Sequence, residues 1–376
     1  MSAMSKAVLA IIVPALVAVT NFVPVSTAPR PLSIIDLGTL GGTFSSAIAI
    51  NDRGQVTGTS LTASGESHAF LWEDGQITDL GTLGGSFSFP LAISKFGMIV
   101  GDSQLSTGDV HGFLWRDGVM TDLGTLGGTL SNARAISDRG EIVGASQTSS
   151  GEVHAFIWQD GVMRDLGTLG GTFSFALDIN DRGQVVGEIR TTFGNTHAFL
   201  WQDGLITDLG TLGGASSFFP VINERGQVVG ESQTSAGDFH AFLWQESMMT
   251  DLGTLGGTFN FSVARGINDR GQVVGESHTT SGGFHAFFWE DGVITDLGTF
   301  GGSGSNPSAI NRRGQVVGVA DTQVSGNAFL WHKGVLTNLG TIAGTLSSAR
   351  AINGRGQIVG ESSTSSGEVH AVLWTK

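Results

Sequence analysis

Residues 165–201 read DLGTLGGTFSFALDINDRGQVVGEIRTTFGNTHAFLW and contain three motifs that recur along the chain in the same order. The first motif, Asp-Leu-Gly-Thr-Leu-Gly-Gly, begins at residues 36, 79, 122, 165, 208, 251 and 296, with an altered copy at residue 338. Successive copies start 43 residues apart five times, then 45 and 42. A fixed period of this length is typical of repeat architectures, in which each copy is one supersecondary unit.

The second and third motifs place strands and turns inside each repeat. Ile-Asn-Asp-Arg-Gly-Gln-Val-Val-Gly is clearest at 179–187, and His-Ala-Phe-Leu-Trp and its variants end at all eight tryptophans of the chain. Gly accepts positive φ without steric cost, so the turns at 180–183 and 203–204 predict tight antiparallel hairpins. In this copy we expect four strands, at 175–180, 184–188, 197–201 and 205–212.

The third motif also predicts how the repeats assemble. His-Ala-Phe-Leu-Trp is apolar on both faces of a strand, and such a strand must be covered on both sides. The region opens with a lone fourth strand, 32–40, and ends on a third strand, 370–374. The sequence therefore predicts an all-β, eight-bladed β-propeller of four-stranded blades of about 43 residues. We expect the N-terminal strand to complete the last blade, 346–374, which removes exposed sheet edges.

Composition and charge narrow the function classes. The chain has 376 residues, 58 of them glycine, no cysteine and a net charge of −14. Its few basic residues are dispersed along the chain, which argues against nucleic-acid binding. Residues 1–28 have the pattern of a secretory signal peptide, with an uncleaved anchor as the alternative. We expect residues 29–376 to be a single repeat domain, secreted, extracellular or periplasmic, monomeric, and without a transmembrane segment after cleavage of the leader.

Histidines begin the third strand in seven of the eight repeats, and Asn327 takes the eighth position. A ring of histidines that share metals is disfavoured, because equivalent strands of neighbouring blades should lie roughly 10 Å or more apart. We expect no metal and no cofactor, and a structural role for these histidines. In five repeats an acid two residues earlier could orient the imidazole: Glu66, Asp109, Glu152, Asp238 and Glu368.

Two groups of residues are candidates for ligand binding. The loops that leave the fourth strand should share one face with those between the second and third strands, and this face carries Phe44, Phe87, Phe173 and Phe259. Aromatic and hydroxyl side chains together suit carbohydrate or peptide contacts, although phenylalanines that plug gaps between blades would follow the same pattern. The repeats also differ at first-strand positions that carry Arg134, Arg265, Arg350 and Asp178. The second motif carries an arginine in seven repeats. An acid directly precedes this arginine in five of them, which suggests that these arginines and acids form ion pairs with one another.

Together the three motifs resemble the HAF-repeat family of bacterial extracellular proteins over residues 32–376. This resemblance implies export and a repeat architecture, but no active site. No catalytic constellation stands apart from the repeat. We therefore predict a non-enzymatic binding or scaffold module for a glycan or an extracellular protein. The alternative is a propeller polysaccharide hydrolase or lyase, in which Asp178, Arg134 and His278 would converge at the mouth of the central channel.

Overall fold

The computed structural model describes residues 32–376, which form one compact unit. The predicted leader, residues 1–28, lies outside the described residues. Within residues 32–376 every regular element is a β-strand, so the all-β prediction is confirmed. No helix in this part of the chain is long and apolar enough to cross a membrane.

Antiparallel ladders group the strands into units of four that follow one another along the chain. The first four units contain β2–β5 (Gly41–Ile50, Val56–Thr62, Ser67–Glu73, Gln76–Asp79), β6–β9 (Gly84–Ile93, Ile99–Leu105, Val110–Arg116, Val119–Asp122), β10–β13 (Gly127–Ile136, Ile142–Thr148, Val153–Gln159, Val162–Gly167) and β14–β17 (Ser174–Ile179, Val185–Arg190, Thr196–Gln202, Leu205–Asp208). The next units contain β18–β21 (Gly213–Ile222, Val228–Thr234, Phe239–Gln245, Met248–Asp251), β22–β25 (Ser262–Ile267, Val273–His278, Phe284–Glu290, Val293–Asp296) and β26–β29 (Ser305–Ile310, Val316–Asp321, Gly326–His332, Val335–Asn338). The last unit combines β30–β32 (Ser347–Ile352, Ile358–Ser363, Val369–Thr375) with β1 (Ser33–Gly38).

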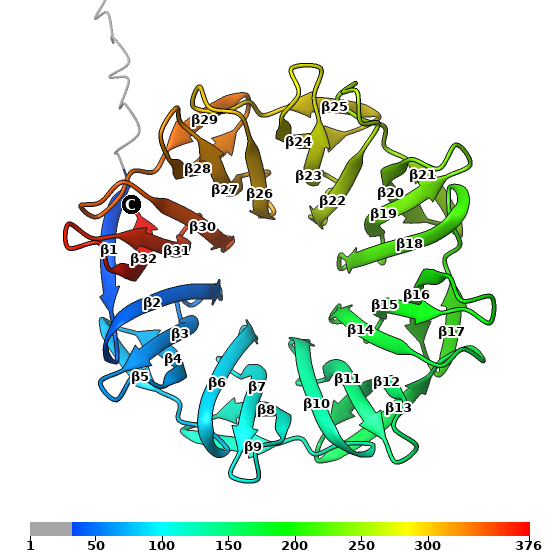
Figure 1. The fold of residues 1–376 in the computed structure, drawn as a ribbon, viewed down its shortest axis with the longest axis horizontal. Helices are drawn as coiled ribbons and strands as arrows, with labels where there is room; N and C mark the ends of the chain where they lie inside the picture. Colours follow the sequence, from blue (N-terminus) through cyan, green and yellow to red (C-terminus); the bar gives the residue numbers. More distant parts are fainter. Residues whose placement is uncertain (1–31) are drawn as a thin grey trace, which may run out of the picture. The chain divides into compact units, whose positions relative to one another are not determined.

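The two ends of the described region meet in this last unit. β1 runs antiparallel to β32, with Ser33 opposite Thr375 and Asp36 opposite Val372. Figure 1 shows the units arranged around a central opening, with β1 beside β32 and the first strand of each unit innermost. The pairing of the N-terminal strand with the last unit agrees with the sequence prediction. The units are not all separate sheets, because single parallel bridges such as Phe44 to Val369 join four of them into one sheet of 16 strands.

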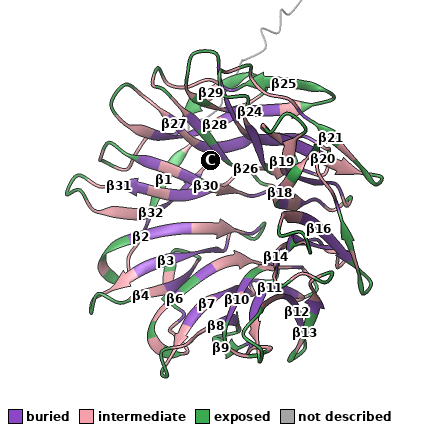
Figure 2. Cartoon of the chain, turned by 45° about the vertical axis from the view of Figure 1, so that its right-hand side comes forward, coloured by how far each residue is buried: buried purple, intermediate pink, exposed green. Residues whose placement is uncertain are grey.

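The hydrophobic core lies in the seams between neighbouring units. The seam at the chain ends, for example, contains Val359 and Leu373 from the last unit, Val56 and Phe70 from the first, and Leu37 from β1. Figure 2 shows buried segments in the middle of the strands and exposed residues in the loops. Each sheet is thus covered on both faces, as the doubly apolar third motif requires.

Turn chemistry explains the strand ends in the β14–β17 unit. Asp203 and Gly204 have φ of 51° and 88°, which is the geometry of a two-residue hairpin turn. In the longer turn, Asn180 Oδ1 accepts hydrogen bonds from the backbone N–H groups of Arg182 and Gln184. The fourth strand ends at Asp208, earlier than the predicted Leu212, and Gly210 with φ of 73° follows it.

Candidate functional site at the mouth of the channel

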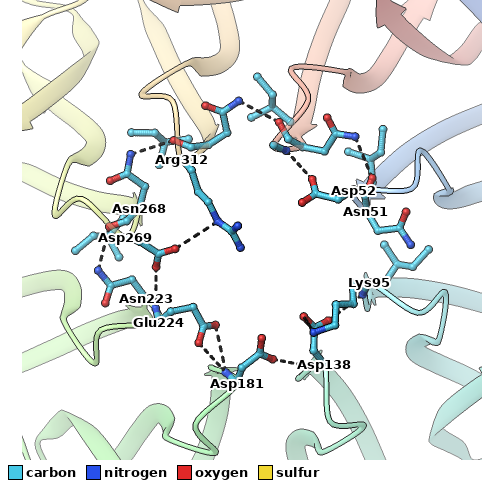
Figure 3. A pocket seen from close by; sticks show the side chains of 18 of the residues that line it. Asn51, Asp52, Lys95, Asp138, Asp181, Asn223, Glu224, Asn268, Asp269 and Arg312 are labelled. Atoms are coloured by element: carbon cyan, nitrogen blue, oxygen red, sulfur yellow. Dashed lines mark hydrogen bonds and ion pairs between the residues drawn. The ribbon is translucent and has the colours of Figure 1, made fainter.

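The turns that join the first and second strands surround a cavity of about 620 Å³, which we call the channel mouth. Each unit contributes residues of the Ile-Asn-Asp stretch of its second motif, or of the equivalent stretch, to the lining (Figure 3). The same segment of every repeat therefore forms the channel mouth. Mouths of β-architectures are frequent ligand sites, because they are concave and several side chains converge there.

A ring of asparagine side chains fixes the geometry of the mouth. The Asn Nδ2 donates a hydrogen bond of 3.0 Å to the carbonyl oxygen at the equivalent position in the next unit, and this occurs at six joints: Asn51, Asn180, Asn223, Asn268, Asn311 and Asn353. The bond from Asn353 to Asn51 O crosses from the last unit to the first. At the remaining positions, Ser94 and Ser137 replace the amide. The mouth is therefore a preorganised frame.

Carboxylates stand one residue after this ring and bond to the backbone of the preceding unit. Asp138 Oδ1 accepts from the Lys95 N–H at 2.9 Å, and Asp181 Oδ1 accepts from the Asp138 N–H at 2.7 Å. The Asp181 N–H donates to Glu224 at 3.1 Å, and the Glu224 N–H donates to Asp269 at the same distance. Asp52 Oδ1 accepts from the Gly354 N–H at 2.8 Å. Figure 3 shows these side chains following one another around the opening.

Five acids and two bases line the mouth, which gives a formal charge of −3 when all are ionised. Lys95 Nζ lies 2.9 Å from Asp138, and Arg312 Nε lies 3.4 Å from Asp269. Among the described residues, Asp52, Asp181 and Glu224 have no cation within ion-pair distance. Burial and the neighbouring carboxylates together raise the pKa of Glu224, although the Asp181 N–H opposes them. Burial also works to raise the pKa of Asp138, but the Lys95 ammonium and N–H hold it below its usual value.

The recurring arginines of the second motif were expected to form mutual ion pairs with these acids, and that expectation is wrong, because no ion pair within residues 32–376 joins the two groups. The carboxylates instead accept backbone N–H groups from the neighbouring unit. The signal available in the sequence was the acid before the arginine in five repeats, at Asp52, Asp138, Asp181, Glu224 and Asp269. Its assignment failed because backbone donors carry no mark in the sequence.

The histidines of the third motif pair with a different acid from the one predicted. Their Nδ1 atoms lie 2.7–2.9 Å from the aspartate that opens the first motif, in seven pairs: His68 with Asp79, His111 with Asp122, His154 with Asp165, His197 with Asp208, His240 with Asp251, His285 with Asp296, and His370 with Asp36. Of the predicted partners, only Glu152 and Glu368 approach an imidazole, at 3.8 and 4.0 Å. The hairpin between the third and fourth strands sets this pairing, and a constant separation of 11 residues within six of the pairs was its signal in the sequence.

The same aspartates also hold the backbone of the loop that follows. In the β6–β9 unit, Asp122 Oδ1 accepts the Gly124 N–H at 2.8 Å. At the eighth position, Asn338 makes the same bond to Gly340, also at 2.8 Å. The second imidazole nitrogen of His197, Nε2, lies 3.2 Å from the backbone carbonyl oxygen of Ala215. These contacts support a structural role for the pairs. No group of three or more His, Cys, Asp or Glu within residues 32–376 could hold a metal ion.

The predicted channel residues lie on separate strands with separate partners. Asp178 on β14 accepts the Ile222 N–H at 3.1 Å, and burial raises its pKa to about 6. The Arg134 guanidinium on β10 lies 6.0 Å from the ring centre of Phe175. His278 at the end of β23 is buried and contacts the rings of Phe259 and Phe284. The three residues proposed to converge in a polysaccharide-cleaving site therefore do not meet.

The other two arginines of this group bind glutamates. Arg350 Nη2 donates to Glu361 at 3.2 Å and Arg265 Nη2 to Glu276 at 2.6 Å. The side chain of Glu231, on β19 in the unit before that of Arg265, makes no hydrogen bond within the described residues. Burial, with Glu188 and Glu276 nearby, raises the pKa of Glu231 to about 7 despite the opposing charge of Arg265.

The four phenylalanines of the predicted loop face differ in exposure. Phe259 is 69% exposed and Phe44 36% exposed. Phe87 and Phe173 are half-buried, and their rings contact those of Phe89 and Phe175 at centroid distances of 5.3 and 6.3 Å. Both contacts join residues of the same unit, so they do not decide between gap filling and ligand binding, and exposed Phe259 contacts the ring of His278.

Comparison with known proteins supports the fold. No protein-family model matches the sequence, and no curated protein matches it. Among solved structures, the chain is similar to dipeptidyl peptidase 4 of Porphyromonas gingivalis, with a TM-score of 0.58, 9% identity, and coverage of 90% of this chain and 58% of that one. It is also similar to a prolyl endopeptidase (TM-score 0.57, 10% identity, 80% and 50% covered) and to a puromycin-hydrolysing peptidase of Mycobacterium tuberculosis (0.53, 13%, 87% and 59%). The chain thus spans between half and three fifths of these peptidases.

These likenesses define the class as an all-β, propeller-like fold, and at such low identity they show the fold alone. The function predicted from the sequence was a non-enzymatic binding or scaffold module for a glycan or protein. The solved structures named above are described as peptidases, which are hydrolases, and their descriptions conflict with that prediction. That prediction is withdrawn.

Proposed function

We propose that residues 32–376 form an eight-bladed β-propeller, closed by β1 on β32, that receives the positively charged end of a peptide substrate in a peptide-hydrolysing system. Asp52, Asp181 and Glu224 carry this proposal, because they present carboxylates to the channel mouth with no cationic partner among the described residues. Peptides carry an ammonium at the N-terminus and often on side chains. Such groups donate strong, charge-assisted hydrogen bonds to carboxylates.

Preorganisation supports the proposal. The asparagine ring and the backbone hydrogen bonds hold the carboxylates in place before a ligand arrives, so binding needs little reordering of the site. The cavity of about 620 Å³ is within the range of small-ligand pockets. The similar folds belong to proteins described as peptidases, which favours a peptide over other cations.

Binding of a tetrapeptide, Lys-Ala-Ala-Ala with a free N-terminus, to residues 32–376 tests the proposal. Asp181→Asn removes one charge while its amide oxygen can still accept the Asp138 N–H. We expect affinity about fivefold weaker, which corresponds to about 1 kcal/mol for one carboxylate near a cation in a partly aqueous site. Asp291→Asn is the matched control, because this exposed aspartate lies in a hairpin turn outside the mouth. It should bind like the unaltered protein.

Two results would reject this function. One is equal affinity for Lys-Ala-Ala-Ala and for its uncharged acetylated counterpart, acetyl-Ala-Ala-Ala-Ala-amide. The other is an affinity that does not change between low and high salt, since screening weakens an attraction between exposed charges.

Membership of the HAF-repeat family and export from the cell remain proposals that rest on the three motifs and the leader pattern of residues 1–28. Fractionation of cells that express the full chain tests export. A mature protein outside the cytoplasm that lacks residues 1–28 is expected, and full-length protein retained in the cytoplasm would contradict it.

A further inference from the structure

A second cavity lies outside the channel mouth, where the β26–β29 unit meets the β30–β32 strands. It has a volume of about 250 Å³, and we call it the seam pocket. Its walls include Val319, Gly326, Leu346, Ser348 and Val369. Val369 begins β32 directly after the loop from β31, which is the end of the unit opposite the turns that form the mouth.

The repeat itself shows what is missing from this pocket. Ser348 pairs with Glu361 across the ladder, and the same ladder position holds phenylalanine in three other units: Phe89 opposite Asp102, Phe175 opposite Glu188, and Phe218 opposite Glu231. In two of these units the ring contacts a second phenylalanine, two residues earlier. In the seam pocket the residue two positions before Ser348 is Leu346, so neither of these two positions carries an aromatic ring.

Two further wall positions are also small here and larger in some other units. Gly326 begins the third strand, where Phe239 and Phe284 stand in other units. Ser363, opposite Val369, takes the place of Gln104, Gln147, Gln233 and His278. Small residues at all three positions leave a space here, whereas some other units carry larger side chains, including phenylalanine rings, at one or more of them.

We propose that the seam pocket binds an aromatic side chain of the peptide. An apolar cavity of about 150 Å³ is large enough to take up benzene, so 250 Å³ accommodates a phenyl ring. The one carboxylate in the wall, Glu361, is already bound by Arg350 at 3.2 Å, which favours an uncharged ring over a cation. That the ring belongs to a peptide rests on the proposed function, whereas the pocket's preference for a ring does not.

The test uses acetyl-phenylalanine-amide and acetyl-alanine-amide, which carry no charge and so do not depend on the channel mouth. Ligand-observed NMR on residues 32–376 should detect binding of the phenylalanine compound with an affinity about tenfold or more above that of the alanine compound, from burial of the ring. Ser348→Phe supplies the ring from the chain and should reduce this binding about tenfold. Ser348→Ala leaves the pocket open and should preserve it.

The outcomes separate the two proposals. Equal binding of the two amides to the unaltered protein overturns the pocket proposal, and so does unchanged binding of the phenylalanine compound to a folded Ser348→Phe protein. If the phenylalanine compound binds as expected while Asp181→Asn leaves the affinity for Lys-Ala-Ala-Ala unchanged, the pocket stands and the function proposed for the mouth fails. Circular dichroism of Ser348→Phe and Ser348→Ala verifies that both variants fold.

Discussion

Leu37 offers a quantitative test of how strongly the first strand is held. Its side chain is 4% exposed and packs in the seam between the last unit and the first, against Val56, Phe70, Val359 and Leu373. Leu37→Ala would leave a cavity whose walls are strands fixed by ladders on both sides, so little collapse is expected. Buried Leu→Ala substitutions cost about 2–5 kcal/mol, and we expect about 3 kcal/mol here.

Leu123 provides the matched control, because it occupies the same motif position within a unit that is continuous in sequence. It is 6% exposed and lies in the seam that follows its own unit. Urea unfolding monitored by tryptophan fluorescence gives both free energies. If β1 completes the last unit, Leu37→Ala and Leu123→Ala lose similar stability. A Leu37→Ala protein within about 0.5 kcal/mol of the unaltered one, beside a Leu123→Ala protein that loses about 3, would refute the reasoning.

Two further predictions follow from the titratable groups. The pKa of Glu231 is about 7 in the folded protein against a usual 4.5, so the unfolded chain loses this proton first and stability should fall as pH rises from about 4.5 to 7. Glu231→Gln should remove that part of the pH dependence and be more stable than the unaltered protein above pH 7, and identical urea midpoints at pH 4.5 and 8 in both proteins would contradict this. Asp122→Asn should cost less than Asp122→Ala, by about 1 kcal/mol in urea unfolding, because Asn can still accept the Gly124 N–H as Asn338 does for Gly340. Equal losses in the two variants would show that this cap contributes little.

Much of the fold could be predicted from the sequence because its determinants are local or periodic. The turns at 180–183 and 203–204 follow from glycine and asparagine at fixed positions. The pairing of β1 with β32 followed from counting strands, since an N-terminal fourth strand and a C-terminal three-strand fragment complement each other. The fourth strand was predicted too long: it ends at Asp208, whose Oδ1 accepts the N–H of Gly210 in the loop that follows.

The candidate sites were less predictable because they depend on how neighbouring units face each other. The acids of the mouth were visible as a pattern, but their partners are backbone N–H groups of the adjacent unit. For the histidines, proximity in sequence favoured acids two residues away, whereas the hairpin brings an aspartate 11 residues away into contact. The seam pocket arises from small residues on strands of two units and becomes apparent only once the ladders align them.

The proposed eight-bladed propeller is closed by the pairing of β1 with β32. The chain has no cysteine, so Ser33→Cys and Thr375→Cys, introduced together at paired positions of β1 and β32, give a direct test. Directly paired strand residues have Cα atoms about 4.5–5.5 Å apart, which suits a disulfide. Under mild oxidation at low protein concentration we predict an intramolecular disulfide, seen as a loss of about 2 Da and faster migration in non-reducing electrophoresis. Thiols that stay reduced, or that form only dimers, would contradict the closed ring.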